Sequence, residues 1–318
     1  MVSDPVIQWL LEGDVSIQYQ AFRDLHGTEK DILRKRISTE GWGKSLLAKR
    51  LPNGHWGRSF YQPKWTSSHY TLLELKNLAI EPAISEIRQT LDLIIQNEKH
   101  IDGGINPGEG TRNSDVCING MFLNYAAYFG VPEVHLKSVV DFLIGQQMKD
   151  GGFNCHLNRI GAIHSSMHTT ISVLEGILEY IRNGYSSGIN ELSRMSEEST
   201  EFILRHRLYK SDKTGEIIDN KMTRFSYPCR WRYDVLRVLD YFQDAKIKYD
   251  SRMDDAIELL LKKRNADRKW NLQARHPGQT HAEMEIPGNP SRWNTLRALR
   301  VLKHFGQFVT ARKKETYL

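Results

Sequence analysis

Two short motifs contain side chains of the kinds that bind transition metals. Asp115 and Cys117 lie in the tetrapeptide SDVC, and His168 lies in the tetrapeptide MHTT. Carboxylate oxygen, thiolate sulfur and imidazole nitrogen are ligands that Zn²⁺ accepts, and three protein ligands with an open fourth position mark a catalytic zinc site. The residue types therefore predict that Asp115, Cys117 and His168 bind zinc, if the fold brings the two motifs together.

Three further residues near these motifs are candidates for a fourth ligand. His164 precedes His168 by one helical turn, and Cys155 and His156 lie in the glycine-rich segment before it. The alternative for each motif alone is structural, because a single cysteine at a buried helix start usually packs as a small apolar side chain. The joint occurrence of the three residue types favours the metal site over that alternative.

Basic and aromatic side chains near other helix starts predict an anion-binding surface beside the metal. The basic candidates are Lys64, Arg230, Arg232 and Arg292, and the aromatic ones are Trp65, Tyr233 and Trp293. Guanidinium donors, free backbone N–H groups and the helix dipole act together on an anion. Aromatic faces also suit a polyprene chain or a cation. The alternative is that the arginines only tie helices together by pairing with Asp234, Glu283 or Glu285.

A repeated helical unit positions these residues. Five segments end in similar apolar helices, and in each a leucine lies six residues after the aligned start. The leucines are Leu72, Leu123, Leu174, Leu236 and Leu296. The aligned starts are Thr66, Cys117, His168, Arg230 and Pro290. Cys117 and His168 therefore hold equivalent places in successive units, which predicts that they are neighbours.

Each unit reads as a polar helix, a glycine-rich turn and an apolar helix. The polar helices are expected to begin at Ser85, Glu133 and Ser251. Helices that are apolar on nearly all sides are buried, whereas the polar ones have one wet face. The sequence therefore predicts a closed all-α barrel of about five to six helical hairpins, with the apolar helices inside. Stacked solenoids are the competitor, but their repeats run shorter.

The predicted boundaries give a single domain over residues 1–318. Residues 1–50 form an irregular first hairpin, residues 51–305 form the repeats, and residues 306–318 form a C-terminal tail. The inner helices are expected to begin near Thr66, Ser114, Ser166, Arg230 and Ser291, with no sheet beyond short pairings in the turns.

The turn sequences GHWG, DGGF and KWN resemble those of the terpenoid-cyclase and protein-prenyltransferase superfamily. This resemblance extends from about Val15 to Phe305 and implies an α/α toroid. SDVC and MHTT resemble the zinc motifs of the catalytic β subunits of protein farnesyl- and geranylgeranyltransferases, which implies ligand roles for Asp115, Cys117 and His168. In that family a basic residue three positions before the Asp helps to hold the diphosphate, and Arg112 matches it.

The resemblance implies a zinc-dependent transferase or isomerase that acts at the barrel mouth. Its ligand would be an isoprenoid or another hydrophobic or anionic small molecule, or a thiol-bearing peptide, and a separate helical subunit is a possible partner. One alternative is a class II terpene-cyclase-like enzyme in which Asp115 or Glu283 replaces the usual Asp-x-Asp-Asp acid, since that run is absent from the sequence. Another is a non-catalytic toroid that binds a lipid or a peptide.

Composition excludes several other classes of protein. The 318 residues carry 44 Lys and Arg against 38 Asp and Glu, and 40% of them are hydrophobic, as expected for a packed globular chain. The charge is thinly spread and gives no sign of nucleic-acid binding. No apolar stretch approaches the roughly 18 residues of a membrane span, and the acidic start does not resemble a signal peptide. Three scattered cysteines do not make a disulfide framework, so a cytoplasmic protein is expected.

Overall fold

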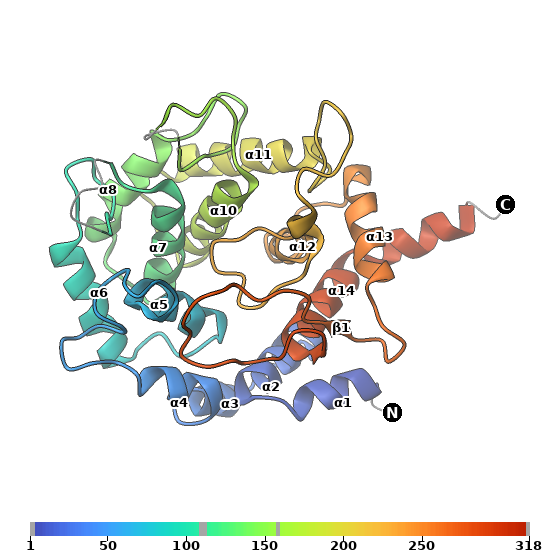
Figure 1. Cartoon of the computed structure of the whole chain (residues 1–318), viewed down its shortest axis with the longest axis horizontal. Coiled ribbons are helices and arrows are strands. Elements are labelled where there is room, and N and C mark those ends of the chain that lie inside the picture. Colours follow the sequence, from blue (N-terminus) through green and yellow to red (C-terminus); the bar gives the residue numbers. More distant parts are fainter. Residues whose placement is uncertain (1–3, 108–112, 157–159, 316–318) are drawn as a thin grey trace.

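The computed structural model describes residues 4–107, 113–156 and 160–315, and it confirms the all-α class (Figure 1). The helices are α1 (Pro5–Leu11), α2 (Val15–Ala21), α3 (Asp31–Arg36), α4 (Gly41–Leu47), α5 (Ser68–Asn77), α6 (Ser85–Asn97), α7 (Val116–Tyr128), α8 (Glu133–Ile144), α10 (Met167–Arg182), α11 (Ile189–Arg205), α12 (Val235–Asp244), α13 (Asp254–Lys262) and α14 (Arg292–Glu315). Short helical turns cover Phe22–His26, Lys64–Thr66, Asn220–Thr223 and Ser251–Met253.

Extended structure in the described ranges is limited to short pairings. The strands β1 (Trp270–Asn271) and β2 (Pro290–Ser291) pair antiparallel, with Trp270 opposite Ser291. Isolated antiparallel bridges also close several turns, for example between Arg50 and Trp56. None of the helices described is both long enough and apolar enough to cross a membrane.

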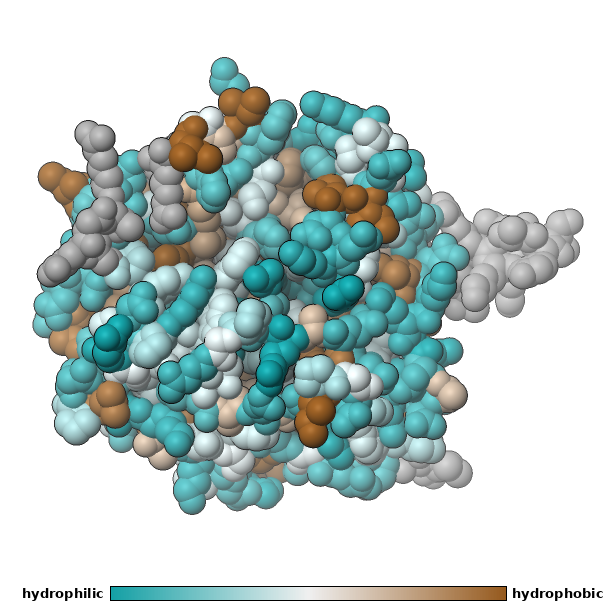
Figure 2. All heavy atoms as spheres, in the orientation of Figure 1, coloured by the Kyte–Doolittle hydropathy of each residue, from teal (hydrophilic) through white to brown (hydrophobic). Residues whose placement is uncertain are grey.

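Six helices lie around one central cavity, and we call α2, α5, α7, α10, α12 and α14 the cavity helices because each contributes to its lining. Figure 1 shows α6, α8, α11 and α13 farther from the centre of the molecule. Contacts join α5 to α7, α7 to α10, α12 to α14, and α14 to α2. The face seen in this view is mostly hydrophilic, with scattered hydrophobic residues (Figure 2), so it presents no single large apolar patch.

Polar contacts join the remaining neighbours among the cavity helices. The Arg237 guanidinium of α12 forms an ion pair with Glu175 of α10, with 2.7 Å between nitrogen and oxygen. Gln20 of α2 donates through Nε2 to the carbonyl oxygen of Asn77 at the end of α5, at 3.0 Å. Each cavity helix therefore contacts two others, in the order α2, α5, α7, α10, α12, α14 and back to α2.

Most predicted starts of the apolar helices lie within two residues of the observed ones, but α12 differs. It begins at Val235, five residues after Arg230. Arg230 has a φ of +56°, which interrupts a right-handed helix. The Asp234 carboxylate accepts a hydrogen bond from the Arg237 amide at 2.9 Å and thereby caps α12 at a later position.

The N-terminal region and the C-terminus also differ from the predicted boundaries. Residues 1–50 were expected to form one irregular hairpin, but this region contains α1, α2, α3 and α4. Asp14 accepts a hydrogen bond from the Ser16 amide at 2.9 Å and starts a new helix after Gly13. At the other end, α14 runs on to Glu315, beyond residue 306 where the tail was expected.

The glycine-rich turns fix the chain just before α7 and α10. The Asp102 carboxylate accepts hydrogen bonds from the amide and the hydroxyl of Ser114, both at 2.7 Å. Asp150 accepts the same two bonds from Ser165, at 2.8 and 2.5 Å. Gly151 has a φ of +94°, and a Cβ there would lie 2.8 Å from the Glu198 carbonyl oxygen, so a larger residue would be strained. Both turns thus hold the start of a cavity helix in the same way.

Candidate metal centre

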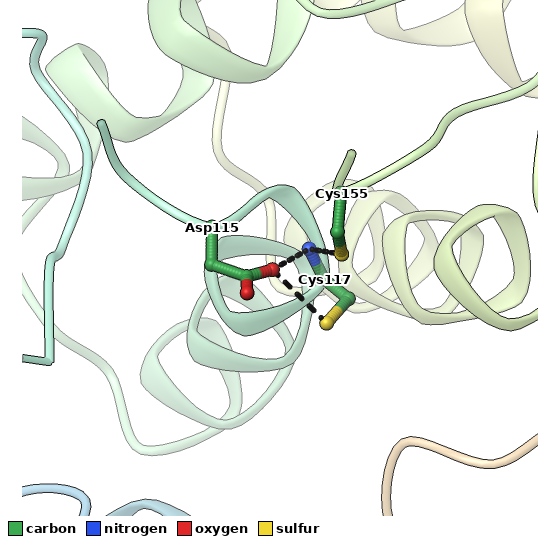
Figure 3. Close-up of side chains that lie close together, drawn as sticks. All are labelled: Asp115, Cys117 and Cys155. Carbon is green, nitrogen blue, oxygen red and sulfur yellow. Dashed lines mark hydrogen bonds between the residues drawn. The ribbon is translucent and has the colours of Figure 1, made fainter. Parts of the chain in front are cut away.

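Three potential ligands come together at the N-terminus of α7 (Figure 3). Asp115 and Cys117 lie at the first residues of this helix, and Cys155 comes from the glycine-rich turn after α8. One ligand atom from each of the three side chains lies within 4.8 Å of the other two. The turn after α8 therefore brings a second thiol to the helix start that carries Asp115 and Cys117.

Local hydrogen bonds hold this group. Asp115 caps α7, and its Oδ1 lies 3.2 Å from both the amide nitrogen and the Sγ of Cys117. The Cys117 amide also donates to the Cys155 Sγ at 3.2 Å. Thr169, in the first turn of α10, accepts a hydrogen bond from the Cys155 amide at 3.3 Å, and its Oγ1 lies 3.2 Å from the Cys155 Sγ. Thr169 thus orients the second cysteine.

The electrostatics of the group favour a protonated Cys117 when no metal is bound. The hydrogen bond with the Cys155 thiol, burial, and the neighbouring Asp115 carboxylate together raise the pKa of Cys117 well above its ordinary value. Two thiols and a carboxylate are a ligand set that Zn²⁺ accepts, and zinc binds cysteine as the thiolate. The residues present therefore fit a zinc site with three protein ligands and one open position, and binding would release the Cys117 proton.

His168 was expected to complete this group, but the structure brings Cys155 there instead. The His168 Nδ1 accepts a hydrogen bond from the Tyr233 amide at 2.7 Å, and the ring packs edge-on against Trp231 at 5.2 Å. Burial, with Arg237 and Arg232 nearby, lowers the pKa of His168 to about 4. The histidine therefore holds the segment before α12 in place as a neutral ring.

From the sequence, Cys155 was predicted only as one of three candidates for a fourth ligand. The other two, His156 and His164, are exposed and lie outside the three-residue group. A sequence signal for Cys155 is its place in the turn DGGFNC. The equivalent turn DGGI, at Asp102, precedes the helix start that carries Cys117. The sequence alignment relates equivalent helix starts, whereas this candidate ligand comes from the turn that precedes one of those starts.

A pocket of about 370 Å³ contains several of the predicted anion-binding residues. We call it the mouth pocket; its lining includes Lys64, Trp65, Trp231 and Arg232. The Lys64 ammonium lies 4.9 Å from the Trp65 ring centre and 5.4 Å from that of Trp231. Burial is the main cause that lowers the pKa of Lys64, while the Asp115 carboxylate of the candidate metal centre acts to raise it. The mouth pocket thus combines cations with aromatic walls near the thiols.

Two predicted anion-binding arginines are engaged elsewhere. The Arg230 Nε lies 3.5 Å from a carboxylate oxygen of Glu74, and its guanidinium stacks at 4.3 Å on the Trp65 ring. Burial raises the pKa of Glu74 to about 7. The Arg292 Nε donates to the Trp9 carbonyl at 3.0 Å, which ties α14 to α1. The alternative of structural ion pairing therefore applies to Arg230, although its partner is Glu74 rather than an acid named from the sequence.

The other predicted residues are spread over the molecule. Tyr233 is buried and donates through its hydroxyl to the Leu208 carbonyl. Trp293 stacks on Tyr227 with 4.5 Å between ring centres and lines the central cavity. Glu283, an alternative acid, forms an exposed ion pair with Arg275. Arg112 lies outside the described residues.

Comparisons with known proteins add no family assignment. No protein-family model matches the chain, and no curated protein matches its sequence.

Proposed function

We propose that the chain is a zinc-dependent enzyme of the terpenoid-cyclase and prenyltransferase type that activates a thiol-bearing substrate. The observation that carries this proposal is the group of Asp115, Cys117 and Cys155, whose ligand atoms lie within 4.8 Å of one another. Three ligands from two separate segments resemble an open catalytic site more than a closed structural one, which has four protein ligands. The enzyme would be a transferase or an isomerase.

We further propose that the cavity helices form a closed α/α toroid. The circular order of contacts among the six cavity helices supports closure. The identical hydrogen bonds of Asp102 to Ser114 and of Asp150 to Ser165 support an underlying repeat. A second kind of contact is shared by the first and last proposed units, which contain Trp56 and Trp270. Each indole donates a hydrogen bond of 2.7 Å to the carbonyl oxygen ten residues before it.

The residues of the mouth pocket would bind and orient the substrate. A zinc ion held by Asp115, Cys117 and Cys155 would supply a Lewis acid that lowers the pKa of a thiol in the open position. Lys64 and Arg232 are placed to bind an anionic part of the substrate or of its leaving group. Trp65 and Trp231 would pack against its apolar part.

The lining of the central cavity favours a thiol-bearing substrate over a long isoprenoid. In this class of toroid an isoprenoid chain would need an apolar interior. Charged side chains such as Glu175, Arg237, Asp240 and Arg297 instead line the cavity, and an apolar chain there would remove water from these ion pairs. The favoured substrate is therefore a polar thiol that stays in the mouth pocket.

The proposal predicts that a small thiol enters the open metal position. With Co²⁺ in place of zinc, adding glutathione or 2-mercaptoethanol should give a saturable increase in thiolate-to-cobalt absorption. Arg232→Gln should weaken the binding of anionic glutathione by about ten-fold or more, since a hydrogen bond to a charged group contributes about 1.5–3 kcal/mol. Binding of neutral 2-mercaptoethanol should be unchanged in that variant. If neither thiol alters the cobalt spectrum, the proposed thiol activation is wrong.

A further inference from the structure

We infer that the central cavity is a second binding site, which takes a small molecule carrying several negative charges, such as a phosphorylated or polycarboxylate compound. The cavity has a volume of about 720 Å³, within the range of about 300–1,000 Å³ that is usual for small-molecule sites. All six cavity helices contribute to its lining. This site does not depend on zinc or on the mouth pocket.

The charge of the lining determines the kind of ligand. Nine lysine and arginine side chains and five carboxylates line the cavity, and Glu74 pairs with one of the nine, Arg230, from outside the lining. The lining therefore has an excess of three positive charges when Glu74 is ionised. The most buried cations are Arg230, Arg237 and Arg297, which are 6%, 4% and 6% exposed. Arg182, Lys246 and Lys303 are exposed members of this set, and the excess of positive charge gives the cavity a field that attracts an anionic ligand.

The acids of the lining are already shared between cations. Asp24 lies 2.6 Å from both Arg23 and Arg300. Asp240 lies 3.2 Å from Arg297 and 3.6 Å from Arg300. Because two carboxylates serve three arginines here, the guanidinium groups retain capacity to bind an added anion.

Two buried polar side chains of the lining also have no protein partner at one atom. Trp293 and Asn124 are each 2% exposed, and both line the cavity. Within the part of the chain that the structure describes, the Trp293 Nε1 and the Asn124 Oδ1 make no hydrogen bond. Buried polar atoms are rarely left unsatisfied. The indole N–H is a donor suited to an oxyanion, and the amide oxygen can accept from a hydroxyl of the same molecule.

The cavity is distinct from the candidate metal centre. On α7 the cavity lining begins at Asn124, seven residues after Cys117, so the two are about 10 Å apart along the helix axis. Arg230 lines the cavity while the Trp65 ring on which it stacks lines the mouth pocket, so this pair forms part of the wall between the two spaces.

Binding of inorganic pyrophosphate, measured by calorimetry on the full chain, tests this inference. The wild-type protein should bind pyrophosphate, and added salt should weaken the binding.

Arg300→Gln should weaken pyrophosphate binding by about ten-fold or more, the loss expected for one hydrogen bond to a charged group. This variant leaves Asp24 paired with Arg23 and Asp240 paired with Arg297, so the fold should persist. Trp293→Phe should also weaken binding, because it keeps the ring on Tyr227 but removes the N–H donor.

Two control variants make the test specific. Arg194→Gln changes an arginine on α11 that pairs with Glu198 at the surface, and it should leave binding unchanged. Arg232→Gln changes the mouth pocket and should also leave it unchanged. Loss of binding in Arg232→Gln but not in Arg300→Gln would overturn the inference, because the anion would then bind in the mouth pocket. The same follows if folded wild-type protein binds neither pyrophosphate nor citrate at millimolar concentration.

Discussion

Replacing Cys117 by alanine is expected to weaken zinc binding by more than about 100-fold, since even residues that only support a metal ligand contribute about 10- to 100-fold. Cys155→Ala should have an effect of similar size, because both thiols belong to the same group. The helical fold should persist in both variants, since each side chain is small and only partly buried. The measurement is a competition titration of reduced protein with a chromophoric zinc chelator, with circular dichroism as the check on folding.

Two control variants distinguish this ligand set from the one expected from the sequence. Cys229→Ala removes a thiol outside the group, which hydrogen-bonds to the Ser226 carbonyl at 3.2 Å, and it should retain zinc. His168→Gln should retain zinc as well, because the His168 Nδ1 accepts from the Tyr233 amide and the Nε2 of the neutral ring therefore carries the proton and has no lone pair for a metal. Loss of zinc in His168→Gln together with retention in Cys155→Ala would instead restore the ligand set predicted from the sequence.

Acid is expected to destabilise the protein through its buried histidines. Burial is the main cause that lowers the pKa of His69 to about 3 and the pKa values of His168, His276 and His281 to about 4. In the unfolded chain these rings take up protons near pH 6.5, whereas in the folded chain they stay neutral until the pH is much lower. The stability they contribute is therefore complete above pH 6.5 and is lost as the pH falls towards about 4.

The two most buried of these histidines, His69 and His276, set the expected size of the effect. Each should lower the free energy of unfolding by about 2 kcal/mol between pH 7 and pH 5. Glu74 acts in the opposite sense, because burial raises its pKa from 4.5 to about 7. Between these pH values the folded chain holds a proton that the unfolded chain releases, so acidification over this range stabilises the fold through Glu74.

Urea unfolding of wild type and His69→Gln at the two pH values isolates the histidine effect. The loss of stability between pH 7 and pH 5 should be about 2 kcal/mol smaller in His69→Gln than in the wild type. His135→Gln, at an exposed position on α8, should show the wild-type loss. An equal loss in wild type and His69→Gln would contradict the account of a buried, neutral His69.

The aligned turn and leucine patterns allowed much of the secondary structure to be predicted from the sequence. The helices after the turns at Asp102 and Asp150 begin where the alignment places them, because side-chain caps and glycine turns are local features. The start of α12 was missed, since the choice between Arg230 and Asp234 as the cap depends on the ion pair of Arg230 with Glu74 from α5. Such a contact between distant residues leaves no pattern in the local sequence.

The candidate site was predictable only in part. Asp115 and Cys117 lie close in sequence and their grouping follows from the start of one helix, whereas Cys155 arrives through the tertiary fold. The charged cavity was not predicted, although Arg297, Arg300 and His304 recur every three or four residues along one side of α14. That basic stripe beside the buried apolar residues Leu296, Val301 and Phe305 was the available signal.

The zinc content of the wild-type protein is the most direct test of the proposed metal centre. The protein should be purified under reducing conditions, since oxidation of Cys117 and Cys155 would remove two ligands. We expect reduced protein to bind one zinc ion per chain near neutral pH and to release it to a strong chelator or on acidification, which protonates the ligands. Folded protein with both thiols reduced that binds no stoichiometric zinc would contradict the account.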